Sequence, residues 1–122
     1  MMLAVWVSLA ASAGAVARYL MDRFVQARHR TGLPFGTFFI NLIGTFVLGL
    51  VTAAGAGHHM DASLGTVIGV GLCGGFTTWS TFCWETVALF ESGAGAGAVL
   101  NMAGSLTLGA GAAALGLALG SL

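Results

Sequence analysis

The chain has 122 residues, of which 57% are hydrophobic and only 7% are charged, and its formal net charge at pH 7 is zero. A soluble domain carries about 25% charged residues. This chain therefore cannot cover its surface with polar side chains, and we expect an integral membrane protein. The four basic residues are all arginine, which gives no indication of nucleic-acid binding. No nucleophilic side chain and basic side chain are expected at the same depth in the membrane, so an enzyme is not expected.

Four apolar segments reach the length of about 20 residues that a bilayer core demands. These predicted spans are residues 3–20, 35–54, 63–90 and 95–119. The connecting segments are short and leave no room for a soluble domain. The sequence therefore predicts an all-α, multi-pass membrane protein in which residues 1–122 form a single four-helix domain.

Arg18 lies near the end of the first predicted span, and two interpretations of it stay open. Its long side chain can snorkel to the interface, or it can stand in a vestibule and attract anions. Arg23, Arg28 and Arg30 are assigned to the first loop, whereas the other loops and both termini contain no arginine. Because loops rich in arginine stay in the cytoplasm, the first loop is predicted to be cytoplasmic and both termini external.

The second span carries Thr37, Asn41 and Thr45 at intervals of four residues. This spacing places the three polar side chains on one face of a helix. They can form hydrogen bonds between helices, or they can line a polar track along a pore. The pattern alone leaves both interpretations open.

The third span contains the most informative pattern, because residues 74–82 read Gly-Gly-Phe-Thr-Thr-Trp-Ser-Thr-Phe. Two glycines and a cluster of hydroxyl side chains inside an apolar segment predict a break in the helix. Within a bilayer such a break is tolerated only where protein or a water-filled cavity receives the freed backbone groups. Breaks of this kind supply carbonyl, amide and hydroxyl groups to ions, so the pattern favours a transport function.

The third span contains three further candidate functional residues, which are Glu85, Trp79 and Phe82. Glu85 is the acidic residue deepest within a predicted span, and such carboxylates usually face a cavity or a partner. Trp79 and Phe82 share a helix face, which indicates either packing or an inward-facing pair of rings whose positive edges can contact an anion.

Glycine makes up 20 of the 122 residues, and small residues let membrane helices approach closely. Gly65–Gly69 and Gly116–Gly120 both have the GxxxG spacing of close helix contacts. Four thin helices leave little space for a pore inside one subunit. A pathway between subunits, and hence an oligomer, is therefore predicted.

The segment at residues 74–82 resembles the signature of the Fluc/CrcB family of fluoride channels. Further matches are Gly-Ala-Val-Ala-Arg-Tyr at residues 14–19, Phe-Ile-Asn-Leu-Ile-Gly at residues 39–44, and Glu85. The resemblance implies an antiparallel dimer of four-helix subunits in the inner or plasma membrane of a prokaryote, embedded in lipid. It also implies that fluoride leaves the cytoplasm passively, down its gradient, which lowers fluoride toxicity.

The resemblance further implies the positions of the functional residues. A structural Na⁺ that is not transported would be held at the dimer centre by the backbone carbonyls of Gly74 and Thr77. Arg18 would stand at the vestibule. The fluoride pathway would be lined by Asn41, Trp79, Phe82, Ser80, Thr81, Thr37, Ser105 and Glu85.

Two residues depart from the family pattern, since Trp79 replaces a phenylalanine and Asn101 replaces a tyrosine. Together with the one-sided arginines, they suggest a subunit of fixed orientation that pairs with an oppositely oriented paralogue, either as a conducting subunit or as a non-conducting one. A proton-coupled four-helix exporter of small molecules is the alternative from another class. Replacing Glu85 with Gln would separate the two, because such a carrier needs the carboxylate.

Overall fold

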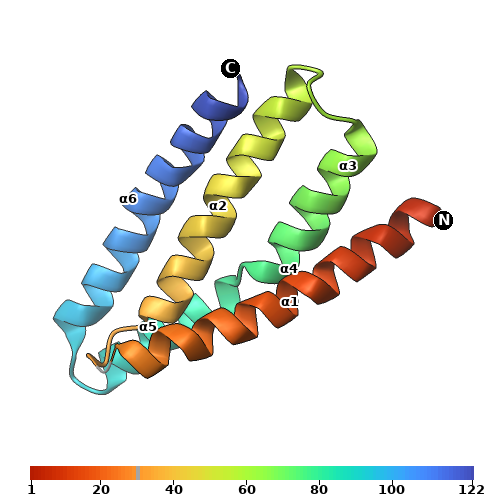
Figure 1. Cartoon of the computed structure of the whole chain (residues 1–122). Helices are drawn as coiled ribbons and strands as arrows, with labels where there is room; N and C mark the ends of the chain where they lie inside the picture. The colour runs from red at the N-terminus through yellow and green to blue at the C-terminus, as the bar shows by residue number, and fades with distance from the viewer. Residues whose placement is uncertain (30) are drawn as a thin grey trace.

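The computed structural model describes residues 1–29 and 31–122, and these contain helices and turns without any β-strand. The chain path is shown in Figure 1. In chain order the elements are α1 (Met2–Arg28), α2 (Phe35–Ala56), α3 (Ala62–Thr66), the π-helix η1 (Val67–Cys73), α4 (Gly74–Phe76), α5 (Trp79–Glu91) and α6 (Gly95–Gly120).

Four helical units in the described part of the chain are long and apolar enough to cross a membrane, as the sequence predicted. They are α1, α2, the unit Ala62–Glu91 that comprises α3 to α5, and α6. The last three begin and end within two residues of the predicted spans. The expectation of an all-helical, multi-pass membrane protein is therefore confirmed.

Helix α1 requires a correction, because it continues eight residues beyond the predicted end of the first span. Arg23 and Arg28 lie within the helix and not in the first loop, while Arg30 lies outside the described residues. The helix continues because the first strong helix breakers after residue 20 are Gly32 and Pro34. At 1.5 Å per residue, its 27 residues span about 40 Å, which exceeds the thickness of a bilayer core.

The helix ends are set by local chemistry. The Asp61 side chain caps α3 by accepting hydrogen bonds from the backbone N–H groups of Ser63 and Leu64, at 2.9 and 3.2 Å. Between α5 and α6, Gly93 has a φ of +83°, a conformation that glycine adopts without steric cost. The turn brings α6 back antiparallel to α5.

Helices α2 and α6 lie side by side along most of their length (Figure 1). Gly49 of α2 is so close to α6 that a methyl group there would stand 2.6 Å from the Ala113 carbonyl oxygen. Methyl groups at Gly116 and Gly120 would overlap the carbonyl oxygens of Phe46 and Leu50. The close packing predicted for Gly116–Gly120 is confirmed.

The GxxxG pair Gly65–Gly69 behaves differently. A methyl group at Gly69 would meet the Leu48 side chain at 3.3 Å, and one at Gly65 would meet only the Met60 sulfur at 3.9 Å. These two glycines therefore make no close backbone contact with another helix in the described chain, and the spacing alone did not predict their environment.

Helix α1 crosses the third helical unit through glycine contacts of the same kind. A methyl group at Gly71 would stand 2.8 Å from the Val7 carbonyl oxygen, and one at Gly75 would overlap the backbone of Ala11. Gly14 of α1 faces the backbone of this unit in the same way. The α1 backbone is thereby held against the segment that leads into residues 77 and 78.

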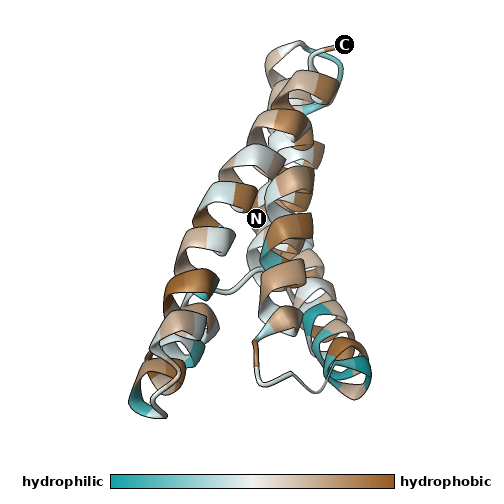
Figure 2. Cartoon of the chain, turned by 90° about the vertical axis from the view of Figure 1, so that its left-hand side faces the viewer, coloured by the Kyte–Doolittle hydropathy of each residue, from teal (hydrophilic) through white to brown (hydrophobic). Residues whose placement is uncertain are grey.

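Few large side chains are buried by these contacts. Ile40 of α2 is 1% exposed, whereas Trp6, Phe24, Val70 and Leu106 are each more than half exposed. Figure 2 shows that hydrophobic residues extend around the outside of the helices, while hydrophilic residues gather toward the ends. Such a surface needs lipid or another protein to cover it.

Candidate functional site

The site forms where the third helical unit is interrupted. Helix α4 ends at Phe76 and α5 begins at Trp79, and both residues between them have extended backbones. Thr77 has φ −79° and ψ 160°, and Thr78 has φ −149° and ψ 124°. They are the Thr-Thr pair of the segment from which a break was predicted.

Hydroxyl groups stabilise both ends of this interruption. Thr77 closes the preceding helical turn, since its N–H and its Oγ1 both donate to the Cys73 carbonyl, at 2.9 and 2.8 Å. Thr78 caps α5, because its Oγ1 accepts from the Thr81 N–H at 3.3 Å. The π-helix η1 runs directly into this region, as π-helical turns often do at functional sites.

Side chains from two other helices satisfy the extended backbone. The Asn41 amide of α2 donates from Nδ2 to the Thr78 carbonyl at 2.9 Å, and its Oδ1 accepts from the Thr78 N–H at 2.8 Å. The Arg18 guanidinium of α1 donates to the Thr77 carbonyl at 3.3 Å. Because unpaired backbone groups are costly away from water, these bonds allow the interruption to exist within a membrane-length unit.

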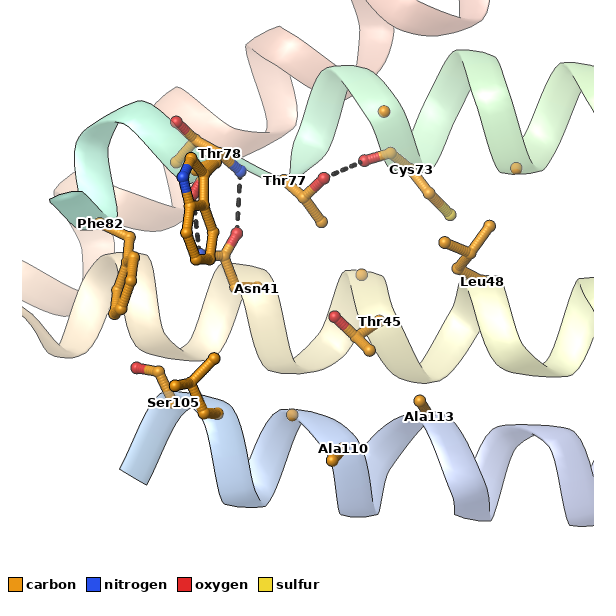
Figure 3. Close-up of a pocket in the computed structure, with 16 residues that line it drawn as sticks. Asn41, Thr45, Leu48, Cys73, Thr77, Thr78, Phe82, Ser105, Ala110 and Ala113 are labelled. Carbon is orange, nitrogen blue, oxygen red and sulfur yellow. Dashed lines mark hydrogen bonds between the residues drawn. The ribbon is translucent and has the colours of Figure 1, made fainter. Parts of the chain in front are cut away.

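A cleft of about 410 Å³ opens beside the interruption, between α2, α6 and the third helical unit. Figure 3 shows Asn41, Phe82 and Ser105 at the end nearest residues 77 and 78. Thr45, Leu48, Ala110 and Ala113 lie further along α2 and α6. The walls are mainly apolar, with a few convergent polar groups, as is typical of ligand sites.

Ser105 and Asn41 provide the polar groups aimed at this cleft. The Ser105 Oγ is buried and has no hydrogen-bond partner among the described residues. Asn41 uses one of the two N–H groups of its Nδ2 for the Thr78 carbonyl, so its second N–H is available to a ligand. The cleft therefore offers an amide donor and the Ser105 hydroxyl, with the Thr45 hydroxyl further along α2.

Trp79 and Phe82 form an aromatic pair on the same cleft. Their ring centroids are 5.0 Å apart, with 42° between the ring planes. Phe82 is 6% exposed whereas Trp79 is 69% exposed, so the indole ring stands at the open side. The helix face shared by these residues was predicted from their spacing, and the structure places both rings on the cleft.

The remaining predicted pathway residues lie apart from this cleft. Thr37 donates from Oγ1 to the Glu85 Oε1 at 2.9 Å, and Glu85 borders a separate cavity of about 470 Å³. Ser80 and Thr81 belong to the first turn of α5, where their hydroxyls lie near that of Thr78, at 3.4 and 3.0 Å. The structure thus divides the predicted pathway into three groups: the cleft residues, the Thr37–Glu85 pair, and the two hydroxyls at the start of α5.

Asp22 was not predicted as a site residue, yet it borders the same second cavity as Glu85. The Asp22 Oδ1 and the Glu85 Oε2 are both buried without a hydrogen-bond partner among the described residues. The Asp22 carboxylate also packs so closely on Gly36 that a methyl group there would overlap it. The sequence feature that could have identified Asp22 was its position as an acidic residue two positions after the predicted end of the first span.

Asn101, where the family pattern has tyrosine, lies on α6 away from the cleft described above. Its Nδ2 donates to the Thr86 Oγ1 at 2.8 Å, and Thr86 donates in turn to the Phe82 carbonyl at 2.7 Å. Asn101 therefore joins α6 to α5 and stabilises the turn that carries the Phe82 ring.

The fold and the cleft define a multi-pass helical membrane protein with a polar site at an interrupted helix, an arrangement found in transport proteins. Comparison with protein families makes the assignment specific. The family described as CrcB-like protein, Camphor Resistance (CrcB), matches residues 5–117, and the chain belongs to this family.

Curated relatives cover nearly the whole chain. The protein named Fluoride-specific ion channel FluC 1 from Frankia casuarinae is 49% identical over 114 residues, which are 89% of this chain and 88% of the relative. The Streptomyces avermitilis protein of the same name is 46% identical, covering 92% of each chain. Fluoride-specific ion channel FluC 2 from Cutibacterium acnes is 46% identical, covering 95% of each. The predictions of this family and of a non-enzymatic protein are confirmed.

Proposed function

We propose that this chain is a subunit of a fluoride-specific channel that lets fluoride leave the cytoplasm passively, down its gradient, and thereby lowers fluoride toxicity. The observation that carries the proposal is the cleft at the interrupted helix. There the Asn41 amide, the Ser105 hydroxyl and the Trp79–Phe82 ring pair converge on one space. The names of the curated relatives support fluoride as the ion.

The groups around the cleft suit a small anion. An ion that enters a narrow path must be compensated for its lost hydration. The second N–H of Asn41 and the hydroxyl of Ser105 can donate hydrogen bonds, and the edges of aromatic rings carry partial positive charge. Helix α5 begins beside the cleft, and the positive end of a helix dipole favours anions.

A second copy or a paralogue in antiparallel orientation would complete the pathway. The cleft is open on one side, and Trp79 at its edge is largely exposed. A partner would wall this side and bring its own α5 against the cleft, where Ser80 and Thr81 could join the path. We place Thr37 and Glu85 at one end of this path. A homodimer and a heterodimer with a paralogous subunit both satisfy these requirements.

A structural Na⁺ is proposed at the interruption, held by the Gly74 and Thr77 carbonyls. The donor set fits a hard cation, which prefers oxygen ligands. The Gly74 carbonyl loses its helical donor, because the N–H of Thr78 bonds to Asn41 instead, and a side chain at Gly74 would meet no other atom within 4 Å. One chain supplies two carbonyls, and the Thr77 oxygen, which already accepts from the Arg18 guanidinium, would have to bind Na⁺ through its second lone pair. An antiparallel partner would have to supply the remaining ligands.

The membrane of this subunit is proposed to be the inner or plasma membrane of a prokaryotic cell. Arg23 and Arg28 lie on the last turns of α1, and Arg30 follows in the sequence. By the positive-inside rule this end would face the cytoplasm. Lipid would then cover the exposed apolar faces outside the subunit interface.

Fluoride efflux from liposomes tests the proposal directly. Liposomes would hold the chain alone or with a co-expressed paralogue, with Na⁺ present and a fluoride electrode outside. We expect fast efflux that excludes chloride. Efflux from the chain alone would establish a homodimer, and efflux only with the paralogue would establish a heterodimer. Folded protein that gives no fluoride efflux in either preparation would refute the proposal.

A proton-coupled exporter is the second candidate, and one observation favours it. The Glu85 Oε2 and the Asp22 Oδ1 are buried without partners among the described residues and border one cavity, and paired carboxylates of this kind serve as proton relays. A pH gradient would drive such a carrier, whereas it would not drive a passive channel. The same liposomes, assayed with and without a pH gradient, distinguish the two.

A further inference from the structure

We infer that Arg18 is a positioning residue of the interrupted helix: its guanidinium holds the Thr77 carbonyl, and through this peptide group it sets the geometry of the cleft. The inference deepens the proposed function, and its transport readout rests on that function. Its structural readout does not.

Helix α1 approaches the interruption closely on the face that carries Arg18. Gly14 lies four residues before Arg18, so the two share one face of α1. A methyl group at Gly14 would overlap the Leu72 carbonyl oxygen and would stand 2.8 Å from the Phe76 nitrogen. The α1 backbone therefore lies directly against the third helical unit, which brings the base of the Arg18 side chain within reach of residue 77.

The contact between Arg18 and Thr77 is a hydrogen bond from a charged donor at a helix end. The Thr77 carbonyl follows the end of α4, where carbonyls lack helical donors and the helix dipole is negative. The half-buried Arg18 guanidinium donates to this oxygen at 3.3 Å. A hydrogen bond from a charged donor is stronger than a neutral one. The guanidinium is thus directed at the interruption and not at the membrane surface.

The peptide between Thr77 and Thr78 is held at both ends. Arg18 of α1 holds its carbonyl, and the Asn41 Oδ1 of α2 accepts from its N–H at 2.8 Å. Because a peptide group is planar and rigid, two such bonds fix its orientation. Arg18 is not among the described residues that line the cleft, so it acts on the cleft through this peptide.

The sequence provides a specific probe of this peptide. Residues 77 and 78 are the only adjacent pair of threonines in the chain. Protein made with ¹³C-carbonyl threonine and ¹⁵N threonine therefore gives a single carbonyl-correlated amide signal, which reports the Thr77 carbonyl and the Thr78 N–H together. The signal would be recorded in detergent micelles for the wild type, Arg18→Gln and Arg18→Lys.

Arg23→Gln is the matched control. Arg23 lies on the same helix and carries the same charge, but its guanidinium donates to the Tyr19 hydroxyl at 3.0 Å. Its removal takes one positive charge from α1 without touching the interruption. An effect of net charge alone would therefore be the same in Arg18→Gln and in Arg23→Gln.

In Arg18→Gln we expect the Thr77–Thr78 signal to shift and fluoride flux to fall by about tenfold or more, because bonds to charged groups are among the strongest. Arg18→Lys should shift the signal less and restore part of the flux, and Arg23→Gln should leave both unchanged. If Arg18→Gln does not fold, Arg18→Lys carries the test against Arg23→Gln.

An unshifted signal in Arg18→Gln overturns the inference, and so does a shifted signal with unchanged flux. Reduced flux with an unshifted signal also overturns it, since Arg18 would then act through its charge alone. A wild-type protein that carries no fluoride would refute the proposed function. The shift of the signal would still show whether Arg18 holds this peptide.

Discussion

At the scale of single residues, Asn41 connects the structure of the interruption to the cleft. Its amide oxygen and one amide N–H hold the backbone of Thr78, while its second N–H is available to the cleft. The two interpretations of the polar face of α2, interhelical bonding and a pore lining, therefore do not exclude each other. One side chain can serve both purposes because an amide offers two donors and an acceptor.

Asn41→Ala removes both hydrogen bonds to Thr78. We expect a loss of about 1–3 kcal/mol in stability, because a backbone N–H and a carbonyl lose their partners. Fluoride efflux should fall by about tenfold or more, since the proposed path also loses a donor. Thermal unfolding and electrode-recorded efflux measure the two effects. Thr52→Val is the control on the same helix, because that hydroxyl bonds within α2. Wild-type efflux from Asn41→Ala would contradict the proposed role.

Glu85→Gln distinguishes a channel from a proton-coupled carrier. Gln keeps an oxygen that can accept from Thr37 but cannot release a proton. For a channel we expect fluoride flux to stay within about tenfold of the wild type, because less than about 1.4 kcal/mol would be lost, and we expect no drive by a pH gradient. Liposome efflux at matched and unmatched pH measures both. If transport is driven by protons in the wild type and disappears in Glu85→Gln, the exporter is the better interpretation.

At the scale of elements, the glycines of α6 determine how closely α2 can approach. Gly116 and Gly120 leave no room for a side chain against α2, whereas a methyl group at Gly111 would meet no atom within 4 Å outside its own helix. Glycines on one helix can therefore be separated into those that allow packing and those that do not contact another helix in the described chain.

Gly116→Ala and Gly111→Ala should change stability in opposite directions. The first inserts a methyl group where it would overlap the Phe46 carbonyl oxygen, and overpacking costs about 1–3 kcal/mol. The second replaces glycine by alanine in an open helical position, which favours the helix by up to about 1 kcal/mol. Thermal unfolding in detergent would compare the two. Equal effects would show that α2 and α6 do not pack through Gly116.

At the scale of the whole molecule, the subunit exposes more surface than a compact protein of its mass. Its accessible surface is 7512 Å², whereas a soluble monomer of 12.3 kDa is expected to expose about 6,100 Å². The excess agrees with a bundle whose apolar faces are covered from outside.

The one-sided arginines predict a single orientation in the membrane. Because arginine-rich ends stay in the cytoplasm, we expect a tag at the C-terminus to be cleaved by external protease in all intact spheroplasts. A tag placed after residue 30 should be protected and serves as the control. Cleavage of about half of the C-terminal tags would instead show insertion in both orientations and would favour the antiparallel homodimer over a pair with a paralogue.

The sequence by itself determined the four helical units and the family, and it predicted where the helix of the third unit is interrupted. Long apolar segments can hardly avoid forming helices in a bilayer, and the Gly-Gly and hydroxyl pattern at residues 74–82 marks the segment around Thr77 and Thr78. The sequence did not predict that α1 continues to Arg28, because the apolar segment ends before the helix does. The sequence also did not predict that Gly65 lacks a close helix contact, or that Asp22 borders the same cavity as Glu85. Both facts depend on how helices distant in the sequence pack together.

Only the tertiary structure decided which groups meet. Arg18 and Thr77 are 59 positions apart, and Asn41 and Thr78 are 37 apart, so no local pattern pairs them. The spacing of Thr37, Asn41 and Thr45 predicted one face, yet Thr37 bonds to Glu85 while Asn41 and Thr45 border the cleft. Periodicity reports the direction of a side chain around its own helix axis. What that side chain contacts depends on how closely the other helices pack, which glycine contacts between distant segments determine.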